Sequence, residues 1–182
     1  MERAFNIHVS PRFCVLTATM LFFAPLLWVI AWLAAVVIHE AFHCIALRLC
    51  GKKIYQIRVG IDGARIIAED LNRGETIFCT LAGPFGGLML LFAAEIFPHL
   101  AVCGLLQSVY NLLPIFPFDG GRAFLAAMQL LFREELAAKL CAGAEILTCF
   151  FLLVTGAFCI WIWDLGLIPF ILAAIWVIKV MK

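Results

Sequence analysis

Two histidines four residues apart, with a glutamate beside the first, are the best candidates for chemistry in this chain. They lie in the segment His39-Glu40-Ala41-Phe42-His43. Residues i and i+4 share one face of a helix, so both imidazoles can bind the same metal ion, and H-E-x-x-H spacing is typical of zinc sites. Glu40 is then placed to take a proton from a water molecule at the metal. The segment lies in an apolar run, where polar side chains are costly and therefore indicate function rather than snorkelling.

A catalytic zinc ion needs a third protein ligand and one open position. The strongest candidate is Asp119, in the segment N-L-L-P-I-F-P-F-D-G-G-R that begins at Asn111. Its two prolines break a helix, and broken backbone at membrane depth occurs only where it is buried in protein or lines a wet cavity. Asn111 could donate a hydrogen bond to a developing oxyanion, with helix packing as the alternative. We therefore expect one zinc ion per chain, bound by His39, His43 and the strongest third candidate.

Two further features of the apolar runs admit two interpretations each. Glu145 lies in a late apolar run, where it either faces the bundle interior or a water pocket, or acts as a gate or substrate contact. The small residues of Ala82-Gly83-Pro84-Phe85-Gly86-Gly87 are typical of close helix packing. A glycine-rich phosphate loop is excluded there, because no lysine and no P-loop spacing follow.

The composition shows which elements must position these residues. Of the 182 residues, 65% are hydrophobic and 14% are charged, against about 25% charged in a typical soluble domain. A soluble globule of this size could not bury so much apolar surface. The 13 Lys and Arg residues barely exceed the 12 Asp and Glu residues, which argues against nucleic acid as a partner. The remaining class is an integral membrane protein in a lipid bilayer, with a single domain over residues 1–182.

The apolar runs predict an all-α polytopic protein with about six transmembrane helices. All 13 basic residues fall on one side of this arrangement, so positive-inside reasoning places both termini in the cytoplasm. The catalytic core would span about residues 25–132, with accessory helices at 12–24 and 136–182. The predicted passes are Phe13–Ala24, Pro25–Leu49, Ile77–Phe97, Leu100–Phe118, Leu136–Ile160 and Leu165–Val180.

A small β-structure is predicted at the membrane surface. Residues 54–59 read I-Y-Q-I-R-V and residues 64–68 read A-R-I-I-A, with an Asp-Gly turn signal between them. Phe5–Val9 could add a further short strand. The hairpin Ile54–Ala68 could supply a sheet edge to which an extended substrate adds as a strand, and either of its strands could be that edge. The candidate substrate-binding residues are therefore Ile54, Gln56, Ile57, Arg58 and Val59.

The chain resembles the site-2 protease family of intramembrane zinc metalloproteases. The resemblance rests on H-E-A-F-H in one predicted helix, Gly-Pro in the next and N-x-x-P-x-x-P-x-D-G-G after that. The opening I-H-V-S-P and the segment N-L-L-P-I-F-P-F-D-G-G-R are similar to the stage IV sporulation protein FB branch. That branch usually carries a nucleotide-sensing CBS domain. This chain ends at Lys182, just past the last predicted pass, so we do not expect that regulation.

The resemblance also implies roles for single residues. It implies that His39, His43 and Asp119 hold zinc, that Glu40 is the catalytic acid and base, and that Asn111 matches the asparagine of the N-P-D-G region. It implies regulated proteolysis in a bacterial cell membrane. The implied substrates are transmembrane or membrane-associated proteins, such as a sporulation or signalling pro-protein. Regulatory membrane proteins are further expected partners.

The sequence admits three alternatives to the interpretation as an intramembrane protease. A metal transporter would need several acidic and histidine residues along a path, whereas this chain has one compact cluster. An inactive protein that only binds membrane helices would lack a ligand or Glu40, and all four groups are present. A membrane-anchored zinc protease acting on soluble proteins would need a cytosolic domain, and the sequence has no room for one.

Overall fold

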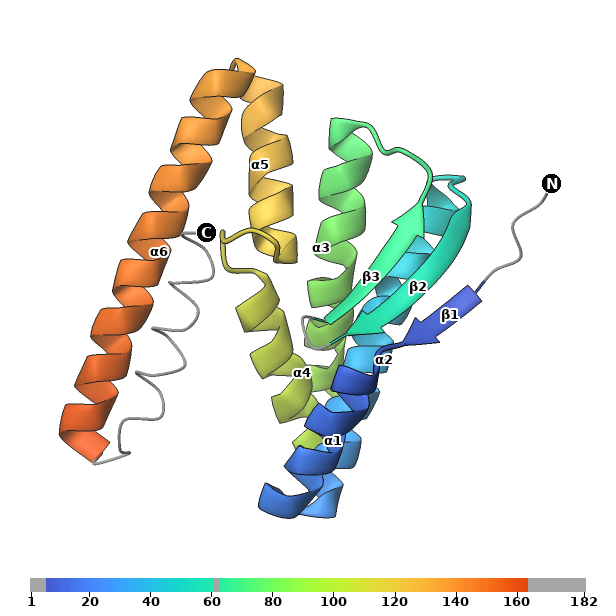
Figure 1. Cartoon of the computed structure of the whole chain (residues 1–182), viewed down its shortest axis with the longest axis vertical. Coiled ribbons are helices and arrows are strands. Elements are labelled where there is room, and N and C mark those ends of the chain that lie inside the picture. The colour runs from blue at the N-terminus through green and yellow to red at the C-terminus, as the bar shows by residue number, and fades with distance from the viewer. Residues whose placement is uncertain (1–5, 61–62, 164–182) are drawn as a thin grey trace. The chain divides into compact units, whose positions relative to one another are not determined.

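The computed structural model describes residues 6–60 and 63–163. The chain forms two compact units, Met1–Leu112 and Leu113–Lys182. The first unit contains a small sheet and several helices, and one of these helices carries both His39 and His43 (Figure 1). Its elements are β1 (Asn6–Val9), α1 (Pro11–Phe23), α2 (Leu26–Leu49), β2 (Ile54–Gly60), β3 (Gly63–Ala68), α3 (Arg73–Met89), the 3-10 helix η1 (Leu90–Ala93) and α4 (Pro98–Asn111).

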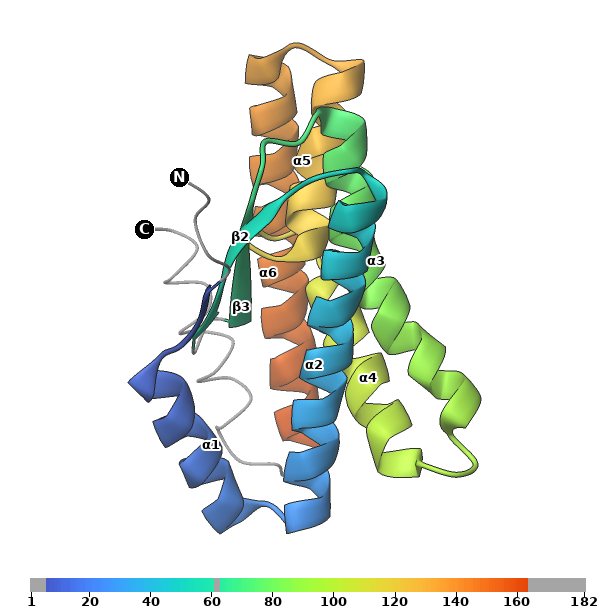
Figure 2. The same ribbon diagram turned by 90° about the vertical axis from the view of Figure 1, so that its right-hand side faces the viewer.

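Helices α2, α3 and α4 pack against one another in the first unit (Figures 1 and 2). Small residues allow this, because a side chain at the contact would push the helices apart. A Cβ at Gly87 on α3 would lie 2.9 Å from the carbonyl oxygen of Gly104 on α4, and closer still to Ser108 Oγ. The Ser108 hydroxyl donates to the carbonyl oxygens of Pro84 at 2.9 Å and Gly104 at 2.7 Å. The small residues of α3 therefore do serve close helix packing.

The sheet has the strand order β1-β2-β3. The predicted hairpin is confirmed, since β2 and β3 pair antiparallel. The predicted N-terminal strand is confirmed as well, because Asn6–Val9 pairs parallel with Gln56–Val59. The sequence leaves open which strand of the hairpin offers the pairing edge. Strand β2 lies in the centre of the sheet and has a neighbour on each side, so the edge of the hairpin is β3. The physical reason is the parallel partner β1, which comes from fifty residues earlier in the chain.

Three helices among the described residues are long and apolar enough to cross a membrane: Leu26–Leu49, Arg73–Ala93 and Glu134–Thr155. They match the second, third and fifth predicted passes, and α1 matches the shorter first pass up to the break at Pro25. The fourth predicted pass ends early, because α4 stops at Asn111. The sixth, Leu165–Val180, lies outside the described residues. The number of six passes therefore stays a prediction.

Over its described residues, 113–163, the second unit contains two helices, α5 (Asp119–Leu131) and α6 (Glu134–Trp163), which form an antiparallel hairpin (Figure 1). The predicted passes include α6 but not α5, because α5 falls between the passes Leu100–Phe118 and Leu136–Ile160. The Asp-Gly-Gly sequence at its start is typical of a turn. Here it is the first turn of an amphipathic helix.

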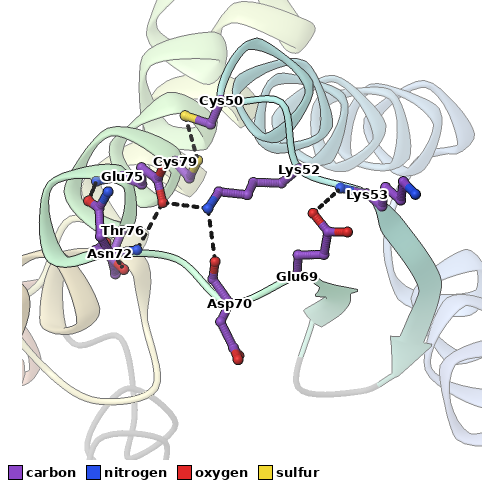
Figure 3. A network of polar contacts seen from close by, with 9 residues as sticks. All are labelled: Cys50, Lys52, Lys53, Glu69, Asp70, Asn72, Glu75, Thr76 and Cys79. Atoms are coloured by element: carbon purple, nitrogen blue, oxygen red, sulfur yellow. Dashed lines mark hydrogen bonds and ion pairs between the residues drawn. The ribbon is translucent and has the colours of Figure 1, made fainter.

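A polar network joins the sheet to the beginning of α3 (Figure 3). Asn72 and Glu75 form a capping box, in which each side chain accepts a hydrogen bond from the backbone of the other. Lys52 Nζ lies 2.8 Å from Glu75 Oε2 and donates to the carbonyl oxygen of Asp70 at 3.0 Å. The hydrogen bond to Glu75 raises the pKa of Lys52 above its ordinary value. Lys52 thus holds the connection between β3 and α3 at Asp70, and the capping box fixes its other end at Asn72.

Candidate metal centre

Helix α2 places His39 and His43 on one face, one turn apart. Both are buried, with 2% and 8% of their surface exposed. Their Nε2 atoms lie 3.2 Å apart and their rings meet edge to face. Two Zn–N bonds of about 2.0–2.1 Å at a tetrahedral angle would place the nitrogens about 3.3 Å apart. The spacing of the two Nε2 atoms therefore fits a shared zinc ion.

The backbone of α3 orients the second histidine. His43 Nδ1 lies 2.7 Å from the carbonyl oxygen of Cys79, and a carbonyl only accepts, so Nδ1 carries the hydrogen. The lone pair of the neutral ring is then on Nε2, the atom that faces His39. A carbonyl on the far nitrogen of a histidine is the usual arrangement behind a metal ligand.

Gly83 keeps the space beside the two imidazoles open, because it has no side chain. A Cβ at this position would lie 2.7 Å from His39 Nε2 and closer still to His43 Nε2. Any side chain larger than hydrogen would therefore occupy the place in front of both nitrogens. The sequence pattern around Gly83 predicts a packing residue, and only the position of Gly83 opposite His39 and His43 indicates this further role.

Asn111 is the last residue of α4. Its Nδ2 donates to the carbonyl oxygen of Gln107 at 3.0 Å, one turn earlier. An amide has two N–H groups, so one N–H remains for a reacting oxygen. The side-chain oxygen of Gln107 is buried and has no hydrogen-bond partner in the described part of the chain. Gln107 was missed at the sequence level, because a lone glutamine in an apolar helix carries no motif.

Asp119 is the first residue of α5 and is buried. The turn before it packs closely on the helix, since a Cβ at Gly121 would lie 2.7 Å from the backbone nitrogen of Phe116. The expected metal site combines the imidazoles of His39 and His43 with this carboxylate, and the assignment of Asp119 as the third ligand stays a prediction. Such a set of nitrogen and oxygen donors is one that zinc accepts.

The remaining predicted residues belong to the first unit. Glu40 follows His39 on α2 and is half-buried; its role as acid and base stays a prediction. Ile54, at the start of β2, packs on a small core that contains Cys79 and Leu47. Arg58 is exposed, and its Nε donates to Gln56 Oε1 at 3.1 Å. Ile57 and Val59 are half-buried on the same central strand. Their part in substrate binding stays untested.

Comparison with known proteins places this arrangement among solved folds. No protein-family model and no curated protein matches the chain. The structure is similar to that of the Site-2 Protease from Methanocaldococcus jannaschii, with a TM-score of 0.65 and 19% sequence identity. The match covers 96% of this chain and 88% of that protein. The chain therefore shares its fold with a site-2 protease.

Proposed function

We propose that this chain is a zinc-dependent intramembrane endopeptidase that cuts membrane-bound proteins within or near their transmembrane segments. The observation that carries the proposal is the histidine pair. Its Nε2 atoms are 3.2 Å apart, on a helix long and apolar enough to cross a membrane. A soluble metalloprotease has no need to place such a pair in an apolar helix, whereas a protease that acts inside the bilayer does.

In this proposal His39, His43 and Asp119 hold one zinc ion. When bound, zinc supplies Lewis-acid polarisation and a nucleophile at neutral pH. The hydrogen bond from His43 Nδ1 to the carbonyl oxygen of Cys79 keeps the ring in the tautomer that a metal requires. The absence of a side chain at Gly83 keeps the space in front of both histidines open.

The other two predicted groups act on the substrate and on water. Glu40 takes a proton from the attacking water and gives it to the leaving amine. The second N–H of Asn111 donates to the oxygen of the scissile carbonyl as negative charge develops on it. Burial of the histidines keeps bulk water away, which strengthens each of these electrostatic interactions.

The substrate must present an extended backbone, because a helix hides its peptide bonds within its own hydrogen bonds. We assign this task to the outer edge of β3, beside which no further strand lies among residues 6–60 and 63–163. The N–H of Glu69 donates to the carbonyl oxygen of Lys53, and in an antiparallel pair the backbone groups alternate in direction. The N–H groups of Ala64, Ile66 and Ala68 therefore point away from β2, toward an added strand.

The expected setting is a bacterial cell membrane, with the protein crossing it several times and both termini in the cytoplasm. The expected substrates are transmembrane or membrane-associated proteins, with a sporulation or signalling pro-protein as the first class to test. Membrane proteins that regulate access to the site are further expected partners. The similarity to the sporulation branch supports the choice of these candidates and no more.

Co-expression with candidate single-pass membrane proteins tests the proposal. Glu40→Gln should abolish cleavage and leave the zinc content of the purified protein unchanged, because Glu40 is not a ligand. Asp119→Ala should lower both. Glu95→Gln is the matched control, since Glu95 is exposed and lies outside the proposed machinery. Normal cleavage by the Glu40→Gln variant would overturn the proposed chemistry. Full zinc content in the Asp119→Ala variant, by elemental analysis, would exclude Asp119 as a ligand.

A further inference from the structure

Glu145 is the one charged residue between Leu140 and Trp163, in a helix long and apolar enough to cross a membrane. A carboxylate in that setting is costly and calls for a partner and a purpose. The partner is the backbone of Phe116, whose N–H donates to Glu145 Oε1 at 2.8 Å. Glu145 therefore links α6 to the segment that leads into Asp119.

The backbone of that segment needs such an acceptor. Residues 114–118 carry three N–H groups, because two of the five residues are proline. Ile115 donates to the carbonyl oxygen of Leu113 at 2.8 Å, and Phe118 donates to that of Ile115 at 2.9 Å. The N–H of Phe116 takes part in neither of these two bonds and donates to Glu145 instead. No water competes for it in hydrocarbon, so an acceptor from a neighbouring helix is worth more than it would be in water.

Close packing transmits the position of Phe116 to the first turn of α5. Ile115 has no exposed surface. A Cβ at Gly121 would lie 2.7 Å from the Phe116 nitrogen and closer still to the carbonyl group of Ile115. Because this contact is between backbone atoms, neither side can yield by changing a rotamer. A shift of Phe116 must therefore move the turn in which Asp119 lies.

The lengths of the two helices bring Glu145 to the right level. Twelve residues separate Asp119 from Leu131 on α5, and eleven separate Glu134 from Glu145 on α6. At about 1.5 Å per residue, both Asp119 and Glu145 lie roughly 17 Å from the connection between the helices. The antiparallel hairpin thus sets the carboxylate beside the start of α5.

We propose that Glu145 is a positioning residue, whose carboxylate holds segment 114–118 and thereby fixes the Asp119 carboxylate for metal binding. This inference rests on the proposed function. It assigns a purpose to the half-buried carboxylate of Glu145, which lies in an apolar helix and is not one of the three proposed metal ligands.

Three variants of the full chain in detergent test it. Glu145→Leu removes the acceptor at similar size, and Glu145→Gln keeps an oxygen acceptor without the charge. Thr148→Val is the matched control, because Thr148 lies on the same helix and its hydroxyl donates to the carbonyl oxygen of Ala144, one turn earlier on that helix. The readouts are zinc affinity by chelator competition, amide hydrogen exchange of peptides containing Phe116, and kcat and KM for cleavage.

Glu145→Leu should weaken zinc binding by about tenfold, the low end of the effect of groups that orient metal ligands. It should also speed hydrogen exchange at Phe116 and lower kcat more than it changes KM. Glu145→Gln should restore most of the affinity and the protection, and Thr148→Val should change neither. If Glu145→Leu behaves like Thr148→Val, or Glu145→Gln fails as fully as Glu145→Leu, the positioning role is overturned. A wild-type protein that takes up no zinc would instead refute the proposed function itself.

Discussion

At the scale of single residues, Gly83 controls the space in front of the histidines. Gly83→Ala should prevent metal binding, because the new Cβ would lie within 2.7 Å of His39 Nε2. We expect zinc content to fall to background by elemental analysis and cleavage to be lost with it. Gly143→Ala is the control, since a Cβ at Gly143 would meet nothing within 4 Å. That variant should keep its zinc. It should gain up to about 1 kcal/mol of stability, as an exposed helical glycine does when changed to alanine.

A second glycine separates loss of metal from loss of packing. A Cβ at Gly87 would clash with Ser108 and with the carbonyl oxygen of Gly104, away from both imidazoles. Gly87→Ala should therefore lower the melting temperature while the protein that remains folded keeps its zinc. Equal zinc loss in the Gly83 and Gly87 variants would mean that the helix contact, and not the space at the histidines, controls the metal.

The spacing of the two histidines could be predicted from the sequence, but the contacts that α3 makes with them could not. H-E-x-x-H places two imidazoles on one helix face whatever surrounds them. The carbonyl of Cys79 and the open position of Gly83 come from α3, more than thirty residues away. A backbone carbonyl has no sequence signature, and a glycine in an apolar helix is more often a packing residue. These contributions become visible only when α2 and α3 are side by side.

At the scale of elements, the capping box of α3 supports the helix that carries Cys79 and Gly83. Asn72→Ala removes the side-chain acceptor of the Glu75 N–H and should cost about 1 kcal/mol of stability. Thermal unfolding in detergent measures this loss. Asp70→Ala is the control, since the backbone carbonyl of Asp70, and not its carboxylate, takes part in the network (Figure 3). Equal melting temperatures for the two variants would show that the cap does not limit the stability of α3.

The free edge of β3 gives a prediction about substrate. Ile66→Pro removes an N–H that points away from β2, while the bonds between β2 and β3 remain. Ile66→Ala makes the same loss of side-chain packing and keeps the N–H. The proline variant should therefore cleave more slowly than the alanine variant, at equal zinc content. The substrate for this comparison is one whose cleavage depends on Glu40. If the two variants cleave it at the same rate, the substrate does not pair with β3, and the proposed zinc chemistry is unaffected.

Local pattern predicted most elements, and long-range pairing decided the rest. Pro25 marks the break between α1 and α2, and the two β-rich runs flanking Asp-Gly form the expected hairpin. The free edge of the hairpin could not be assigned from the sequence, because β1, the parallel neighbour of β2, is distant along the chain. Helix α5 was missed because Asp119-Gly120-Gly121 is typical of a turn when read alone. It is a helix start here because its glycines pack on the preceding segment.

At the scale of the whole molecule, the parallel pairing of β1 with β2 bears on the membrane topology. Strands β1 and β2 are hydrogen-bonded neighbours, and α1 and α2 lie between them in the chain. The chain must therefore leave one side of the membrane after β1 and return to that same side before β2. The N-terminal strand and the hairpin should therefore share a side, as the basic residues predict. In a background without native cysteines, Arg65→Cys should be shielded from an impermeant external thiol reagent. Glu95→Cys should react, and the reverse labelling pattern would overturn the orientation.

The same pairing constrains how the molecule is made. Asn6 lies opposite Gln56, so the first strand leaves the ribosome fifty residues before its partner does. Until then its backbone has no strand to join, and closing so long a loop must wait for the helices between. A nascent chain halted after Leu49 carries an orphan strand, whereas one halted after Ala68 contains every strand of the sheet. Completion of the sheet thus reports that the first helix pair has already been inserted and folded back.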